Sequence, residues 1–180
     1  MSAVTLKSAR LTLRPVTPKD AEAFFDHARL PEVAENAGFL PDSIAKTRSY
    51  LRRSASEWKK SKPERMTFSV LLTRDRAWIG SLELRWLYDG IAEMGFFIHP
   101  RHWGNGYAPE AATAALRAAF GRFGAHRVQG SCWTKNKRSI RVLNKLKFCR
   151  EGRLRGYAKV GGKLQDDYLY AMTVADWRSR

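Results

Sequence analysis

Cysteine is scarce in this chain of 180 residues: it occurs only at Cys132 and Cys149. Neither cysteine belongs to a CxxC pair or to a Cys/His pattern with the spacing of a zinc site. The sequence therefore predicts no metal centre. Two thiols without such a pattern also favour a reducing, cytoplasmic compartment.

Long apolar runs are missing as well. None reaches the roughly 18 residues that a membrane-spanning helix needs, and the N-terminal MSAVTLKSARLTLRP lacks the apolar core of a secretory signal. We therefore expect no membrane partner. Hydrophobic residues make up 44% of the chain and charged residues 28%. This composition and length predict one folded domain over residues 1–180 with a single core.

Acidic residues are few: 17 Asp and Glu face 33 Lys and Arg, which gives a formal net charge of +16. The excess is concentrated between residues 135 and 163, where Glu151 is the only acid. Such a surface suits a polyanionic partner, namely an anionic cofactor, RNA, or an RNA-rich particle such as the ribosome. The alternative is a solvated basic surface that aids solubility.

Apolar periodicity predicts an alternation of strands and helices. We expect strands at 11–16, 66–73, 77–87, 91–98, 126–134, 151–158 and 164–174, and helices at 18–30, 43–58, 109–123 and 137–148, with a loop over 31–43. This order is typical of a mixed α/β domain. The sheet would be mostly antiparallel, with six to seven strands, flanked by about four helices.

The stretch HPRHWGNGYAPEA, from His99 to Ala111, joins an expected strand to an expected helix through two glycines. A helix N-terminus offers unpaired N–H groups, and glycine lets a phosphate approach them closely. The stretch is neither a Walker loop, since no GK(S/T) follows, nor a Rossmann fingerprint, since a third glycine is absent. A turn that needs positive φ at Gly104 or Gly106 is the alternative.

Two further segments accompany this loop. Residues 101–106 resemble the Q/R-x-x-G-x-G/A signature of the GNAT (general N-acetyltransferase) superfamily, and NKRSIRVLNKLKFCREG, from Asn136 to Gly152, is similar to a second segment of that family. The strands AEMGFFI and DDYLYAM fit as well. The resemblance covers most of residues 10–175 and is strongest to the ribosomal-protein alanine N-acetyltransferase branch.

The resemblance implies an acetyl-CoA-dependent N-acetyltransferase whose sheet splays between its fourth and fifth strands, here 91–98 and 126–134. Acetyl-CoA would lie in that gap, with its pantetheine arm paired to the strand backbone and its pyrophosphate on the loop amides. The cofactor-binding residues implied in this way are Phe96, Phe97, Ile98, Trp103, Gly104, Asn105, Gly106, Tyr107, Ala108, Asn136, Ser139 and Lys145.

Transfer of an acetyl group to an amine needs a base for the amine proton and benefits from a proton donor for the leaving thiolate. Glu93, within an apolar strand beside the expected splay, is the candidate base; an outward-facing Glu in a salt bridge is the alternative. Many family members use a Tyr as the acid, but Leu143 occupies that position here. In the ribosomal-protein alanine N-acetyltransferase branch a Ser matches Ser139, so the resemblance makes Ser139 the candidate acid or hydrogen-bond donor, with helix capping as its alternative role. Cys132 is a candidate acyl carrier or simply a small buried residue.

The acceptor is less defined. The branch acetylates N-terminal amines of ribosomal proteins, and its relatives modify small amines, amino acids and antibiotics. The resemblance assigns the acceptor side to residues 17–58, where Tyr50 and Arg52 are candidate contacts together with Tyr157. The arginines of this region favour an anionic acceptor, or else form a solvated helix face. A non-catalytic RNA-binding or acetyl-CoA-sensing module stays open, as does the choice between monomer and homodimer.

Overall fold

The structure of the protein is a computed structural model that describes residues 4–34 and 43–180. Its centre is one sheet of eight strands in the order β1-β2-β3-β4-β5-β6-β8-β7. The strands are β1 (Leu6–Lys7), β2 (Leu11–Pro15), β3 (Arg65–Leu72), β4 (Trp78–Tyr88), β5 (Ile91–Ile98), β6 (Arg127–Trp133), β7 (Cys149–Val160) and β8 (Lys163–Thr173). The helices are α1 (Ala21–Ala28), α2 (Pro31–Ala34), α3 (Ile44–Glu57), α4 (Tyr107–Gly121), α5 (Lys137–Lys145) and α6 (Val174–Arg178).

The expected mixed α/β fold with a mostly antiparallel sheet is confirmed, with small differences in the element count. β1 and α6 are additional short elements. The expected loop over 31–43 is wrong at its start, because Pro31 begins the short helix α2 instead of only ending α1. Proline suits the first turn of a helix, where its missing N–H has no partner to lose. The remainder of that loop, 35–42, lies outside the described residues.

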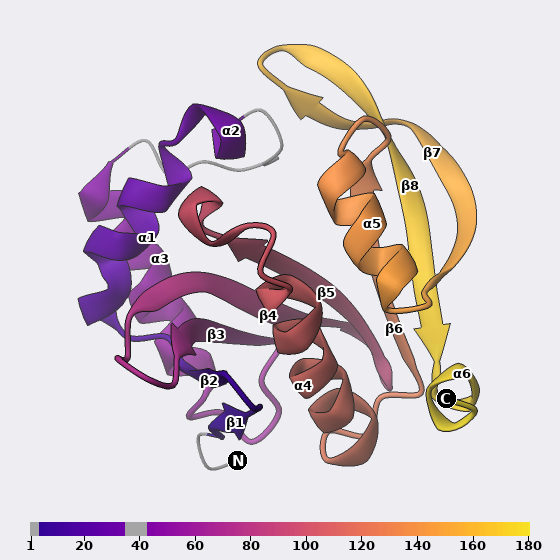
Figure 1. Ribbon diagram of the computed structural model, residues 1–180, viewed down its shortest axis with the longest axis horizontal. Helices are drawn as coiled ribbons and strands as arrows, with labels where there is room; N and C mark the ends of the chain where they lie inside the picture. Colours follow the sequence, from indigo (N-terminus) through magenta and orange to yellow (C-terminus); the bar gives the residue numbers. More distant parts are fainter. Residues whose placement is uncertain (1–3, 35–42) are drawn as a thin grey trace.

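Helices cover both faces of the sheet (Figure 1). α4 packs on β5 and β4 and contacts α5, whereas α1 and α3 pack on β4 and β3 from the other face. The sequence of α4 is rich in alanine, and six of its alanines are buried against the sheet. Small side chains let this helix approach the strands closely, which places its N-terminus beside the end of β5. Strand β3, covered from both sides, is buried along nearly its whole length.

The sheet opens between β5 and β6. These neighbours are parallel and pair over only three residues, from Ile91↔Arg127 to Glu93↔Gln129. Beyond that point the two strands diverge, as Figure 1 shows. Both strands keep their other neighbours, since β5 pairs with β4 and β6 pairs with β8 along their lengths. The predicted splay between the fourth and fifth expected strands is therefore confirmed.

The register of β4 against β5 decides which side chains of the two strands share a face of the sheet. Glu83 lies opposite Gly95, and Arg85 lies opposite Glu93. Cross-strand partners project to the same face of a sheet, and the hydroxyl of Tyr50 on α3 donates to Glu83. These four residues of β4 and β5 therefore share the face that α1 and α3 cover in part.

The described residues contain neither a candidate membrane-spanning helix nor a cluster of metal-ligating side chains. Among the described residues, no helix is both long enough and apolar enough to cross a bilayer. Across the same ranges, 4–34 and 43–180, no three His, Cys, Asp or Glu side chains gather as a metal site requires.

We predict that Gly80→Ala destabilises the protein by about 1–3 kcal/mol, because a Cβ at Gly80 would lie 2.2 Å from the carbonyl oxygen of Phe97. The matched control is Gly95→Ala on the neighbouring strand, where a Cβ would meet nothing within 4 Å. Urea denaturation of the three proteins measures the difference. Equal stability of the two variants would contradict the close approach of β4 and β5.

Candidate active site

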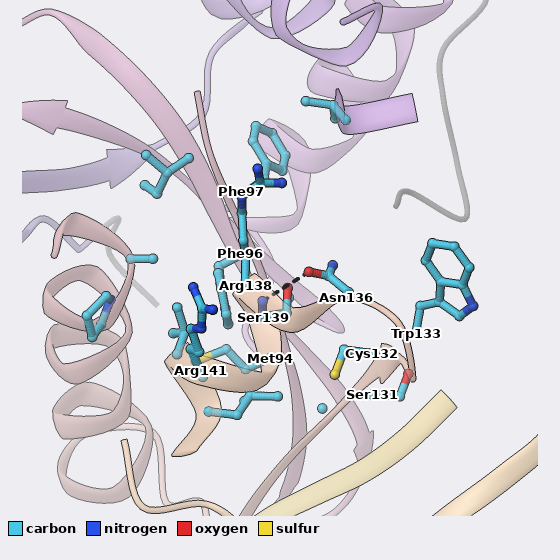
Figure 2. A pocket seen from close by; sticks show the side chains of 18 of the residues that line it. Met94, Phe96, Phe97, Ser131, Cys132, Trp133, Asn136, Arg138, Ser139 and Arg141 are labelled. Carbon is cyan, nitrogen blue, oxygen red and sulfur yellow. Dashed lines mark hydrogen bonds between the residues drawn. The ribbon is translucent and has the colours of Figure 1, made fainter. Parts of the chain in front are cut away.

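A cavity of about 800 Å³ opens where β5 and β6 part. Figure 2 shows its centre: Met94, Phe96 and Phe97 of β5 lie along one side, Ser131, Cys132 and Trp133 of β6 along the other, with the start of α5 near both. Further walls come from the loop before α4, from the β7–β8 hairpin and from the end of α1 with α2. The cavity thus lies at the split in the sheet, with walls from several elements.

The glycine loop forms the mouth of the cavity beside α4. Gly104 and Gly106 take φ values of +80° and +76°, a region that residues with a Cβ rarely adopt. Among backbone hydrogen bonds between described segments, none uses the N–H groups of the five residues from Gly104 to Ala108. The two glycines with positive φ and the N–H groups without a described backbone acceptor therefore lie in the same loop. The loop is the positive-φ turn that the sequence left as one alternative, and its N–H groups suit the anion cradle that was the other.

Cations from α5 face this loop. Arg138, Arg141 and Lys145 line the cavity, and the guanidinium of Arg138 lies 4.1 Å from the ring centroid of Trp103. This cation–π contact joins α5 to the glycine loop across the split. Loop N–H groups, the positive end of the α4 dipole and three cationic side chains together fit a pyrophosphate or another multiply charged anion.

The edge of β5 supplies the second half of such a site. From Met94 onward the edge facing β6 has no strand partner, so its backbone groups are available to an extended, amide-bearing ligand. One group is already used, because the indole Nε1 of Trp103 donates to the carbonyl of Ile98 at 2.6 Å. A backbone edge leading into an anion cradle fits an arm of amides that ends in phosphates.

Comparison with known proteins agrees with this geometry. A family model described as an acetyltransferase (GNAT) domain matches residues 10–149. The chain belongs to this family. It is 31% identical over 170 residues to the uncharacterised N-acetyltransferase YoaA of Bacillus subtilis, covering 93% of this chain and 95% of the relative. The protein is therefore an N-acetyltransferase, and its cosubstrate is acetyl-CoA.

Two other similarities are narrower or structural. Over 84 residues the chain is 34% identical to the ribosomal protein uS5-alanine N-acetyltransferase of Escherichia coli, which covers 47% of this chain and 43% of the relative. A GNAT-family acetyltransferase from Bacillus anthracis superposes with a TM-score of 0.83 at 25% identity, covering 96% of this chain and 99% of the other.

The residues assigned to acetyl-CoA from the sequence are mostly together in the structure. All but one line the cavity: Phe96, Phe97, Ile98, Trp103, Gly104, Gly106, Tyr107, Ala108, Asn136, Ser139 and Lys145. The exception is Asn105, whose side-chain amide donates to the carbonyls of His102 and Trp103. Asn105 therefore shapes the loop from within, and its side chain is not part of the described wall.

Glu93 forms the salt bridge that the sequence left as one alternative, and it also lies on the cavity wall. It lines the cavity, yet its Oε2 lies 2.5 Å from Nη2 of Arg85 on the neighbouring strand. Its side chain keeps 22% of its surface exposed. The carboxylate is thus held in a fixed position by the cross-strand pair while remaining open to the cavity.

At the start of α5 the helix cap is Asn136, not Ser139. The side-chain oxygen of Asn136 accepts from the backbone N–H of Ser139 at 3.0 Å, the contact drawn in Figure 2. The hydroxyl of Ser139 is not used in capping and lines the cavity. Leu143, one turn further on, also lines the cavity and is buried, so an apolar side chain stands where the family resemblance places a tyrosine.

Of the three acceptor contacts expected from the sequence, one lies on the described cavity wall. Tyr157 lines the cavity. Tyr50 is not among the described residues that line the cavity. Its hydroxyl donates to Glu83 at 3.0 Å, and burial together with this carboxylate raises the pKa of Tyr50. Arg52 is exposed on α3 and is not part of the described wall. An acceptor contact through Arg52 therefore stays a prediction that the described cavity wall does not support.

Sequence reasoning also missed residues that the fold brings to the cavity. His27 is 1% exposed and stacks on Phe97 with ring centroids 4.4 Å apart. Burial, with a smaller contribution from His99, lowers the pKa of His27 to about 4. Glu83 on β4 lines the wall as well. Only the register of β4 with β5 and the packing of α1 reveal these positions, since no sequence motif marks them.

We predict that Cys132 reacts with iodoacetamide at pH 8 about 100-fold more slowly than a free cysteine. Burial, and then the charge of Asp167, raise the pKa of Cys132 to about 11, so the reactive thiolate is rare at that pH. Cys149 is exposed and serves as the internal control. Peptide mass spectrometry over time measures both rates, and equal alkylation would contradict the environment described for Cys132.

Proposed function

We propose that this N-acetyltransferase moves the acetyl group of acetyl-CoA to a primary amine by direct attack in a ternary complex, and that the first acceptor to consider is a protein N-terminus. The observation that carries the proposal is the single cavity. It joins an anion cradle, an unpaired strand edge and the carboxylate of Glu93 in one continuous space. Donor and acceptor can therefore occupy opposite sides of the same split.

In this mechanism, the loop amides and α5 cations hold the phosphates of the donor, and the β5 edge aligns its amide arm. The amine nitrogen attacks the thioester carbonyl carbon, the carbon–sulfur bond breaks, and coenzyme A leaves as thiolate. The amine proton passes to Glu93, directly or through one water. The hydroxyl of Ser139 supplies a hydrogen bond to the departing sulfur.

Direct transfer is favoured over an acyl-enzyme route because of the state of Cys132. With a pKa of about 11, its side chain is a neutral thiol at physiological pH. A thiol is a poor nucleophile compared with a thiolate. The small, buried side chain therefore serves as part of the apolar wall.

A ribosomal acceptor is supported by two facts. The relative from Escherichia coli is named for acetylation of an alanine of ribosomal protein uS5. The chain's net charge of +16 would bring it to RNA-rich particles in the cytoplasm, although it would repel a free basic protein.

The base assignment is tested with Glu93→Gln, which keeps the shape of the side chain but removes the proton acceptor. We expect kcat to fall about 10²–10⁴-fold, with acetyl-CoA affinity unchanged in calorimetry. Coenzyme A release from a panel of amines, including N-terminal peptides of ribosomal proteins, is the readout. Glu22→Gln, on the exposed face of α1, is the matched control.

Ser139→Ala is measured in the same assay and should lower kcat less than Glu93→Gln does. Full kcat in Glu93→Gln would reject the base. If no amine of the panel releases coenzyme A while acetyl-CoA still raises the melting temperature, the protein is an acetyl-CoA sensor instead.

Ribosome association has its own expected outcome. Co-sedimentation with ribosomes should be clear at 50 mM salt and fall at least about tenfold by 200 mM, because each phosphate contact releases counterions. Acetyl-CoA is kept saturating in one series, so that competition for the cationic surface of α5 is visible. Absence of association at 50 mM salt would rule out docking.

A further inference from the structure

The part of the cavity around Gly95 is lined by different chemical groups from the part around the glycine loop. We infer that the acceptor amine binds over Gly95, and that Gly95, Glu83 and His27 select an amine that carries a second positive charge and no carboxylate. This inference rests on the proposed function, because it names the acceptor class for the same site. Three independent observations carry it: a bare floor, an unpartnered buried imidazole, and a separation of charge along the cavity wall.

The floor is bare at Gly95. This residue lines the cavity between Glu93 and Phe97 on the same face of β5 and is exposed. A Cβ there would meet nothing within 4 Å, so the absence of a side chain leaves open space and not a packing contact. Across the strand pair, directly opposite, is Glu83. An acceptor lying on Gly95 would therefore have a carboxylate at its side and Glu93 one pleat away.

Glu83 is held in place from behind. Its Oε2 accepts hydrogen bonds from the Tyr50 hydroxyl at 3.0 Å and from the Thr67 hydroxyl at 2.9 Å. Arg65 approaches its other oxygen at 3.5 Å, on the side away from Gly95's strand. The side chain keeps 24% of its surface exposed and lines the cavity. A carboxylate fixed by three groups is a rigid recognition element, not a mobile surface charge.

His27 closes the end of this space. Within the described chain neither ring nitrogen of His27 has a hydrogen-bond partner, although the side chain is buried and lines the cavity. A buried polar group without a partner costs free energy, on the order of 1–3 kcal/mol. Its low pKa keeps the imidazole neutral. One ring nitrogen can then accept a hydrogen bond from an ammonium group without charge repulsion.

The charges that line the cavity are separated by side. Its cations on α5 face the glycine loop, whereas three carboxylates line the wall from strands of the sheet: Glu83, Glu93 and Asp167. Arg85, which pairs with Glu93, is the one arginine or lysine among the described lining residues outside α5. In a chain with nearly twice as many basic as acidic residues, this local excess of acid opposes the composition. It stabilises a cationic acceptor and repels a carboxylate.

Three amines of one chain length test the selection: 1,4-diaminobutane, butylamine and 4-aminobutanoate. We expect kcat/KM to fall at least about tenfold from the diamine to butylamine, and further to 4-aminobutanoate. In Glu83→Gln the advantage of the diamine over butylamine should shrink to about threefold or less. Peptide amides with Lys or Glu at the second position repeat the comparison for N-terminal acceptors.

Two further variants separate recognition from folding. Gly95→Val should raise KM for every amine at least about tenfold while acetyl-CoA affinity and melting temperature stay unchanged. Gly152→Val on β7, where a Cβ also meets nothing within 4 Å, is its control. His27→Phe keeps the stack on Phe97 but removes the ring nitrogens. It should weaken use of the diamine without lowering the melting temperature, a split that a purely structural histidine would not give.

The outcomes distinguish this inference from the proposed function. Equal use of the three amines, or preference for 4-aminobutanoate, would overturn the inference while turnover upholds the acetyltransferase. If no acceptor is turned over, calorimetric binding of 1,4-diaminobutane but not 4-aminobutanoate to the coenzyme A complex keeps the cation site and rejects the function. Absence of both turnover and diamine binding rejects both.

Discussion

The separation of β5 from β6 determines where the cavity of this molecule forms. Three parallel pairs hold the two halves of the sheet together, and beyond Glu93 the strands leave backbone groups without partners. Unpaired N–H and C=O groups in a sheet favour either water or a ligand that can take the place of a strand. The helix that follows β5 begins at the mouth of the split, and the helix that follows β6 lines its other side. Chain order alone thus brings an anion cradle and cationic side chains to the one place where the sheet is incomplete.

Charge follows the same division. The overall excess of +16 acts at long range and draws in polyanions, but it does not decide what happens inside the cavity. There, Arg138, Arg141 and Lys145 all come from α5, while Glu83 and Glu93 belong to β4 and β5. A donor with several phosphates and an acceptor with a positive charge can therefore bind together without competing for the same groups.

The sequence was sufficient for features whose cause is local. Strand and helix periodicity, the glycine loop and the segment after Asn136 are each specified within about fifteen residues, and the structure places them as expected. Features that depend on register or on the phase of a helix were not predictable. The position of Glu83 opposite Gly95 follows from strand pairing, and the stack of His27 on Phe97 joins residues 70 positions apart. The exposure of Arg52 was not predictable either, because no pattern in α3 shows which of its basic residues face solvent.

Leu143 occupies the position where the family resemblance places a tyrosine, and the chemistry of the two reaction partners explains why a leucine can stand there. A thiolate is a stable leaving group and departs without a strong acid, so an apolar Leu143 beside the hydroxyl of Ser139 is compatible with turnover. An amine, by contrast, is protonated at neutral pH and cannot attack until it loses a proton. The greater catalytic demand therefore falls on the acceptor side, where Glu93 and the bare backbone of Gly95 are two residues apart on one strand. If Glu93 accepts the proton, the groups proposed to choose the amine all adjoin the same short segment of β5: Gly95 belongs to it, Glu83 lies opposite Gly95, and His27 stacks on Phe97. An acceptor bound elsewhere would then lie out of reach of the base.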